Sequence, residues 1–85
     1  MRGGAEMRAI NWQVMIGAER KRQDAKWGEQ NHNDLKWLAI LSEEMGKLAK
    51  EILEGGEQGL GRHGTGELVQ VAAVAVAWLE ALGRR

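Results

Sequence analysis

Five side chains with polar groups stand out in two stretches of the sequence. In "SEEMGKLAKE", Glu43 and Glu44 are adjacent, and Lys47 stands where a third acid would help to complete a metal site. In "ELVQVAAVAVAWL", Glu67 and Gln70 are one helical turn apart and share a face. Acids at such spacing on facing helices of a bundle hold hard cations, because Mg²⁺ prefers oxygen ligands. These residues indicate a candidate metal site between two helices.

Each of these side chains also has a purely structural explanation. Glu43 and Lys47 have the i, i+4 spacing of an exposed ion pair, which contributes roughly 0.2–0.5 kcal/mol. Glu67 suits the first turn of a helix, and Gln70 suits an interhelical hydrogen bond. Glu44 is different, because it lies on the flank of an apolar helix face, where a carboxylate loses hydration unless a cation or donor compensates. We favour the ion pair for Glu43 and the metal site for Glu44.

Three helices are predicted to position these groups, over residues 6–26, 34–53 and 67–82. The second has the clearest periodicity, because its apolar residues alternate at spacings of three and four. This spacing is typical of a seam that packs against another helix, and the seam consists of Leu38, Leu41, Met45, Leu48 and Ile52.

The first helix is more polar, and loops are predicted on both sides of the second. Its apolar stripe is narrow and consists of Ile10, Val14 and Ala18. Its second half, "ERKRQDAK", is almost wholly polar, so it should be solvated or face a polar cleft. Gly28 suits the C-terminus of this helix, and Asn33 or Asp34 suits the N-cap of the next. Residues 54–66 are rich in glycine, which predicts a flexible connection.

The third helix is apolar on all sides and must therefore be buried on all sides. Three short helices in one copy cannot bury it, so we predict a homodimer or a larger oligomer such as a tetramer. The same run is too long, and too free of turn residues, for a usual strand. The expected fold is an all-α bundle of three main helices whose core is completed by dimerisation.

Composition narrows the class of protein further. The chain has 85 residues, enough for one small domain, and it contains no cysteine, so thiolate metal sites are excluded. Twelve basic residues balance twelve acidic ones, which argues against binding a nucleic-acid polymer through bulk charge. The longest uncharged run, 68–79, is shorter than the ~20 residues that a membrane span needs. No signal peptide is evident, and we expect a cytoplasmic protein that does not enter membranes.

Three segments together resemble the MazG-like, all-α nucleoside triphosphate pyrophosphohydrolases, particularly the small single-domain versions of phages and mobile elements. "ERKRQDAKWGEQNHND" looks like the family's pre-motif segment, "KWLAILSEEMGKLAKEIL" like its main motif helix, and "ELVQVAAVAVAWLEAL" like its second motif helix. The resemblance implies a helical bundle completed by dimerisation. It also implies Mg²⁺ (or Mn²⁺) as cofactor, and hydrolysis of the α–β phosphoanhydride of a nucleotide to a monophosphate and pyrophosphate.

The family signature, E-E-x-x-E followed after a variable loop by E-x-x-D, can be carried onto this sequence. Glu43, Glu44 and Glu67 match acids of the pattern, so Glu43 and Glu44 are the expected catalytic acids, and Glu44, Glu67 and Gln70 the expected metal ligands. Gln70 replaces the Asp, and its amide oxygen can still ligate. Lys47 replaces the third Glu, and its ammonium repels a cation. Lys47 can instead bind the substrate's phosphates or neutralise an empty acidic site. The alternative function is therefore a non-catalytic nucleotide-binding or helical interaction module.

Other residues fit a nucleotide site. Trp27 or Trp37 is placed to stack on a base, although a tryptophan in a small bundle more often lies in the core or an interface. Arg20, Arg22 and Lys26, on the polar half of the first helix, are candidates to meet phosphates, although a solvated charged face is the commoner explanation. Arg62, in the glycine-rich segment, is a candidate to close over a bound triphosphate.

Overall fold

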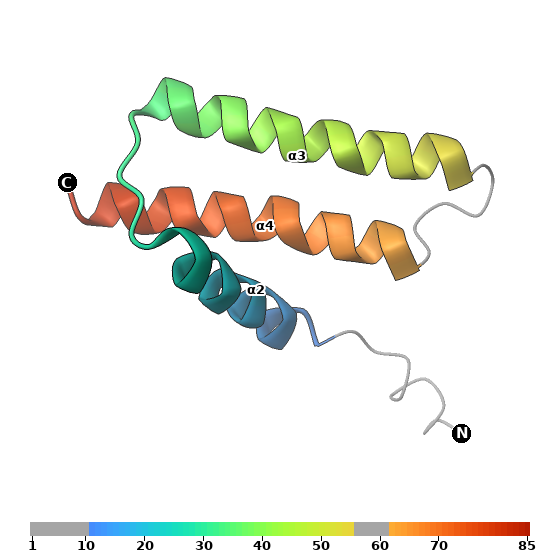
Figure 1. Cartoon of the computed structure of the whole chain (residues 1–85), viewed down its shortest axis with the longest axis horizontal. Helices are drawn as coiled ribbons and strands as arrows, with labels where there is room; N and C mark the ends of the chain where they lie inside the picture. Colours follow the sequence, from blue (N-terminus) through green and yellow to red (C-terminus); the bar gives the residue numbers. More distant parts are fainter. Residues whose placement is uncertain (1–10, 56–61) are drawn as a thin grey trace.

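The structure is a computed structural model, and it describes residues 11–55 and 62–85. These residues form three helices and no strand: α2 (Trp12–Trp27), α3 (Asp34–Gly55) and α4 (Arg62–Gly83). The prediction of an all-α chain with three helices is confirmed (Figure 1).

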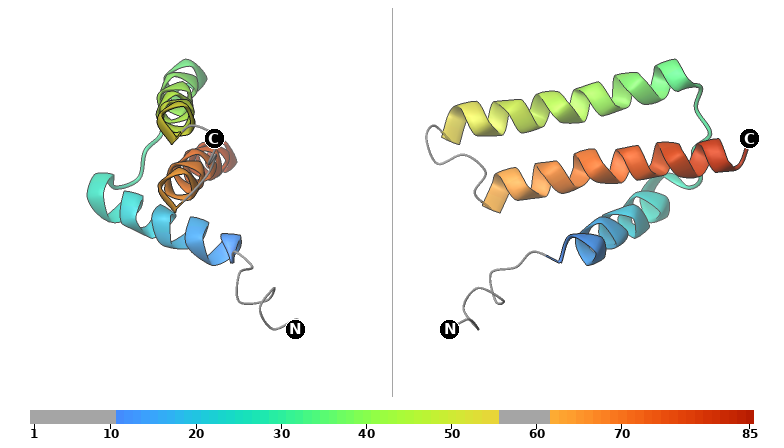
Figure 2. Two further views of the ribbon diagram at one scale, coloured as in Figure 1. Left: turned by 90° about the vertical axis from the view of Figure 1, so that its right-hand side faces the viewer. Right: turned by 180° about the vertical axis from the view of Figure 1, so that it is seen from behind.

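The helix α4 lies at the centre of the arrangement, since both α2 and α3 pack on it. Helices α3 and α4 run antiparallel and side by side, whereas α2 crosses α4 at an angle (Figures 1 and 2). Side chains from all three helices line a cavity between α2 and α3.

Local side-chain chemistry accounts for several helix ends. Asn11 caps α2 by accepting a hydrogen bond from the backbone N–H of Val14 at 3.4 Å. Gly28, with a φ of 72°, ends the same helix, as its sequence position predicts. Asn33 Oδ1 accepts from the backbone N–H of Lys36 at 2.8 Å, so Asn33 is the N-cap of α3.

The connection between α3 and α4 is shorter than its glycine content predicts. Helix α3 continues to Gly55, and α4 already begins at Arg62, so the predicted loop over 54–66 is too long at both ends. A glycine within a helix costs only about 1 kcal/mol relative to alanine. The packing of the apolar turns that follow offsets this cost. Residues 56–61 lie outside the part of the chain that the structure describes.

The core is built around one tryptophan on small residues of α4. Trp37 is only 1 % exposed, and its ring stacks on that of Trp78 at 6.5 Å with an angle of 11° between the planes. The ring of His32 meets Trp37 edge-on at 4.9 Å. The large indole fits because α4 presents small side chains beneath it, namely Val74, Ala77 and Ala81.

Helix α2 packs through polar groups rather than through its apolar stripe. Val14 is 64 % exposed and Ala18 is exposed, so these two residues of the apolar stripe do not pack inward; Ile10 lies outside the described residues. Arg20 Nε instead donates to Glu80 Oε1 on α4 at 3.1 Å. Burial disfavours the charged form of Arg20, but hydrogen bonds to Glu80 and Asp24 outweigh it, and the pKa of Arg20 is raised.

Helix α3 packs on α4 with a different set of residues from its predicted apolar seam. Helix α3 contacts the core of α4 through Trp37, Ile40 and Leu41, whereas Leu38 and Met45 of the seam are about half exposed. Helix periodicity places Leu38, Met45 and Ile52 on one stripe of α3, and Leu68, Leu79 and Leu82 on one stripe of α4. We call these two exposed stripes together the apolar face; it consists of Leu38, Met45, Ile52, Leu68, Leu79 and Leu82.

Two C-terminal arginines tie the 28–33 connection to α4. Arg84 donates to Asn31 Oδ1 at 2.9 Å and to the carbonyl oxygen of Gln30 at 3.0 Å. Arg85 forms an ion pair with Asp34 at 2.9 Å. Hydrogen bonds from Arg85 and from the Trp78 indole hold the pKa of Asp34 below its usual range. These contacts fix the position of the connection that follows α2, and this connection includes Gln30.

Candidate functional site

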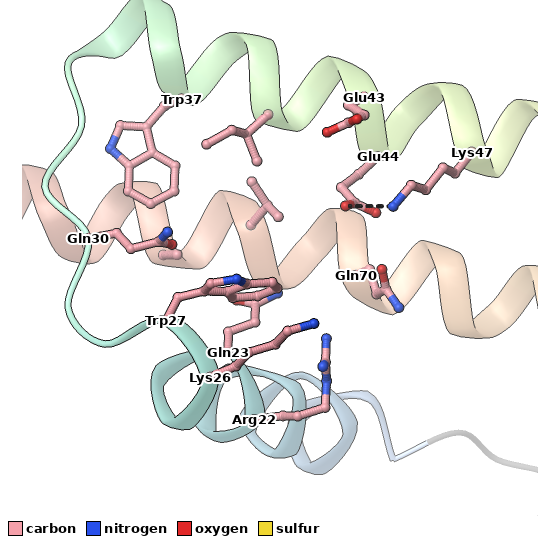
Figure 3. Close-up of a pocket in the computed structure, with 13 residues that line it drawn as sticks. Arg22, Gln23, Lys26, Trp27, Gln30, Trp37, Glu43, Glu44, Lys47 and Gln70 are labelled. Atoms are coloured by element: carbon pink, nitrogen blue, oxygen red, sulfur yellow. Dashed lines mark hydrogen bonds and ion pairs between the residues drawn. The ribbon is translucent and has the colours of Figure 1, made fainter.

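A cavity of about 390 Å³ lies between the three helices, with side chains from each of them at its wall (Figure 3). Its volume falls within the range of small-molecule sites, roughly 300–1,000 Å³. We call it the site pocket. Its lining combines cations, carboxylates, amides and aromatic rings: Arg22, Gln23, Lys26, Trp27, Gln30, Trp37, Ile40, Glu43, Glu44, Lys47, Gln70, Val74 and Ala77.

The acids of α3 differ in exposure as their helix positions predict. Glu43 is exposed, whereas the side chain of Glu44 is only 14 % exposed. The ammonium of Lys47 lies 3.4 Å from Glu44 Oε2, so Lys47 pairs with Glu44 and not with Glu43 as we expected (Figure 3). The i, i+3 partner is preferred because Glu44, not Glu43, points toward the packed side of α3. This distance exceeds the ~2.7–2.9 Å of a strong charge-assisted hydrogen bond.

Two carboxylate oxygens in this region are buried without a hydrogen-bond partner. They are Glu44 Oε1 and Glu67 Oε1, which belong to two of the residues predicted to bind a metal. A buried carboxylate oxygen without a donor or cation is costly. Glu67 does not line the site pocket itself, but Gln70, one turn further along α4, does. A cation bound by Glu44 or Glu67 would offset this cost.

The donor chemistry of these residues fits a hard divalent cation. Glu44, Glu67 and Gln70 would hold Mg²⁺ or Mn²⁺ through oxygen atoms, and water would supply the remaining ligands. This set has two carboxylates and one amide, fewer carboxylates than a metal site built from acids alone. Among the residues that the structure describes, no three His, Cys, Asp or Glu side chains gather closely enough to form a metal-binding group. Lys47, at 3.4 Å from Glu44 Oε2, already supplies one positive charge.

The α2 side of the site pocket is cationic and aromatic. The Lys26 ammonium lies 4.8 Å from the Trp27 ring centre, and the Arg22 guanidinium lies 5.8 Å from it. Arg22 also donates to both oxygens of Glu19, at 2.9 and 2.6 Å, and this hydrogen bonding lowers the pKa of Glu19. Trp27 is 51 % exposed, so part of its ring is open to a ligand. This side is suited to an anion that carries a planar ring.

Most residues singled out in the sequence come together here. Those at the wall of the site pocket are Arg22, Lys26, Trp27, Trp37, Glu43, Glu44, Lys47 and Gln70. Trp37 contributes only an edge, because its ring is buried in the core. Arg20 is not at this wall and turns to Glu80 instead. The side chain of Arg62 lies outside the described residues, although its backbone begins α4.

Two lining residues were missed. Gln23 is 8 % exposed and lies one turn before Trp27 on the same helix, and Gln30 follows in the fixed connection. The spacing of Gln23 from Trp27 was the available signal. An amide within a run of charged residues does not stand out, so the sequence pattern alone does not identify Gln23 as a site residue.

Comparison with protein-family models, with curated proteins and with solved structures found no match to this chain. The family resemblance therefore rests on the motif residues themselves.

Proposed function

We propose that this chain is a MazG-like nucleotide pyrophosphohydrolase domain and that the site pocket binds a nucleoside or deoxynucleoside triphosphate. The observation that carries the proposal is the convergence of the motif residues on one cavity. Glu43 and Glu44 reach it from α3, Gln70 from α4, and Lys26 and Trp27 from α2. No bulk property of the chain requires residues so far apart in sequence to meet at a single hollow.

The lining suggests how a triphosphate would be oriented. The open part of the Trp27 ring stacks on the base, and the ammonium groups of Lys26 and Lys47 attract the phosphates. The exposed carboxylate of Glu43 accepts a proton from the attacking water. Water attacks a phosphorus atom of the α–β bridge, the bridging P–O bond breaks, and the nucleoside monophosphate and pyrophosphate separate. A bound Mg²⁺ or Mn²⁺ supplies neutralisation of phosphate oxygens and activation of that water.

The contact between Lys47 and Glu44 favours a second candidate function. An ammonium 3.4 Å from an expected metal ligand weakens the attraction of the site for a divalent ion. The same contact does not disturb the cations and the tryptophan on the α2 side. A nucleotide-binding module without hydrolysis is therefore the alternative.

Pyrophosphate release separates the two functions. The protein is incubated with each common NTP and dNTP plus Mg²⁺ or Mn²⁺, and free pyrophosphate is measured. We expect turnover that falls at least ~10-fold in Glu44→Gln, because loss of an acid at the site removes electrostatic stabilisation. No release with any nucleotide and either metal would contradict the hydrolase and leave the binding module.

We further propose that a second copy of the chain covers the apolar face in a cytoplasmic homodimer. Leu79 is 66 % exposed, and its neighbours on that face are also large and apolar. Burying these side chains against a second copy would contribute about 25 cal/mol of free energy per Å² of apolar surface. An exposed surface of large apolar side chains suits an isologous two-fold contact. By length and composition alone, Gly66–Gly83 is also apolar enough to cross a membrane, a test that core helices of soluble proteins pass as well.

Light scattering tests the dimer. The wild-type protein should have the mass of two chains or more at micromolar concentration, and Leu79→Lys should shift it to one chain. Val14→Lys is the matched control, because Val14 is similarly exposed, at 64 %, but lies on α2. A wild-type monomer, or a protein soluble only with detergent, would contradict the proposal.

A further inference from the structure

We propose that Lys47 acts as a built-in cation that lets the site pocket bind a nucleotide's phosphates without a divalent metal ion. The proposal rests on the proposed function, since it presumes that the site pocket is where the triphosphate lies. It adds that the protein supplies part of the positive charge that the metal would otherwise bring.

The first support is the position of the ammonium between a buried acid and open space. Glu44 is 14 % exposed at its side chain, whereas Lys47 is 51 % exposed. Figure 3 shows the Lys47 side chain reaching along α3 to Glu44, above Gln70 and the cations of α2. At 3.4 Å the pair is loose. An ammonium has three N–H donors, and among the described residues its one recorded acceptor is Glu44.

The second support is the charge of the lining. Three cations, Arg22, Lys26 and Lys47, face two carboxylates, Glu43 and Glu44, but Arg22 is already paired with Glu19 at 2.6 Å. With Glu19 counted, these charges sum to zero, and a glutamate in place of Lys47 would bring the sum to −2. A triphosphate is strongly anionic at neutral pH. The charge at position 47 therefore affects how strongly the phosphates depend on a metal ion to enter the site pocket.

The third support is that Lys47 and a metal ion would share the same carboxylate. Lys47 already stabilises Glu44 Oε2, and Glu44 Oε1 is left without a partner. A divalent ion at Glu44 must approach this ammonium, so binding of the ion alone is disfavoured. Phosphate approaching from the pocket meets the ammonium without that repulsion. The arrangement favours the nucleotide over the free metal.

Calorimetry with a non-hydrolysable nucleotide tests the role of Lys47. The probes are the α,β-imido analogues of dATP, dCTP, dGTP and dUTP, titrated in EDTA and in Mg²⁺. For the wild-type protein we expect the best analogue to bind with dissociation constants that agree within about threefold between the two buffers, a difference under ~1 kcal/mol. For Lys47→Glu we expect binding in EDTA to weaken at least ~10-fold, and Mg²⁺ to restore it.

The matched control is Lys50→Glu. It makes the same charge change on the same helix, but Lys50 is 75 % exposed at its side chain and does not line the site pocket. It should bind as the wild type does in both buffers. Circular dichroism checks that each variant is helical. As a second readout, Mn²⁺ alone, followed by electron paramagnetic resonance, should bind more tightly to Lys47→Glu than to the wild type.

The outcomes separate this inference from the proposed function. Binding of the wild type only in Mg²⁺, or equal losses in Lys47→Glu and Lys50→Glu, would overturn the role of Lys47 and leave the nucleotide site standing. No binding of any analogue to any variant in either buffer would overturn both.

Discussion

Trp37→Ala is expected to lower the free energy of unfolding by about 3–5 kcal/mol, the usual cost of removing a large aromatic side chain from a core. Trp37 is 1 % exposed and is the largest fully buried side chain of the described residues. Its ring contacts Trp78, His32 and the small residues of α4 at once. The free energy of unfolding of a small domain is only about 5–15 kcal/mol in total. The variant should therefore be largely unfolded or close to it at 25 °C.

Urea denaturation followed by circular dichroism measures this effect. Trp12→Ala is the matched control, because Trp12 is 57 % exposed at the start of α2 and its loss should change the unfolding free energy by less than about 0.5 kcal/mol. Equal effects of the two substitutions would show that Trp37 is not the centre of the core. The packing of α3 on α4 through Trp37 would then not be what holds that side of the site pocket in place.

Lys47→Glu is expected to raise the rate of Mg²⁺-dependent pyrophosphate release by at least ~10-fold, which corresponds to about 1.4 kcal/mol of barrier. The substitution removes the ammonium that lies 3.4 Å from Glu44 Oε2 and adds a third carboxylate to the lining. Both changes strengthen the attraction for a divalent ion. The gain should require metal, since the same variant loses charge complementarity to the phosphates.

The assay is pyrophosphate release over a range of Mg²⁺ concentrations, and Lys50→Glu again serves as the control for a charge change on α3. Activity appearing only in Lys47→Glu would favour the nucleotide-binding alternative for the wild-type chain. A rate that is unchanged or lower at saturating Mg²⁺ would show that Lys47 is not what limits the metal site.

Periodicity was enough to predict the helices and one key burial. The seam spacing predicted a helix over residues 34–53, and α3 spans Asp34–Gly55. The apolar neighbours of Glu44 predicted that its carboxylate would be poorly hydrated, and its side chain is 14 % exposed. Asn33 and Gly28 marked helix ends because their side-chain chemistry acts within one turn. Such features depend on residues close in sequence.

Most of the failures concern contacts between helices. The stripe of α2 did not predict its packing, because Arg20 finds Glu80, sixty residues further along the chain. The rotation of α3 on α4 leaves Met45 half exposed. One failure lies within α3: Lys47 was expected beside Glu43 but pairs with Glu44, since a helix brings i, i+3 and i, i+4 partners equally within reach. A helical wheel gives angles within one helix and not the direction from which a neighbour arrives.

The indole N–H signals of the four tryptophans give the most direct test of the nucleotide site. Trp27 lines the site pocket and is half exposed, whereas Trp12 is exposed elsewhere on α2. In a proton–nitrogen NMR titration with an α,β-imido triphosphate, the Trp27 indole signal should shift to saturation while that of Trp12 stays in place. A Trp27 signal that does not move, or that moves no more than Trp12, would contradict nucleotide binding in the site pocket.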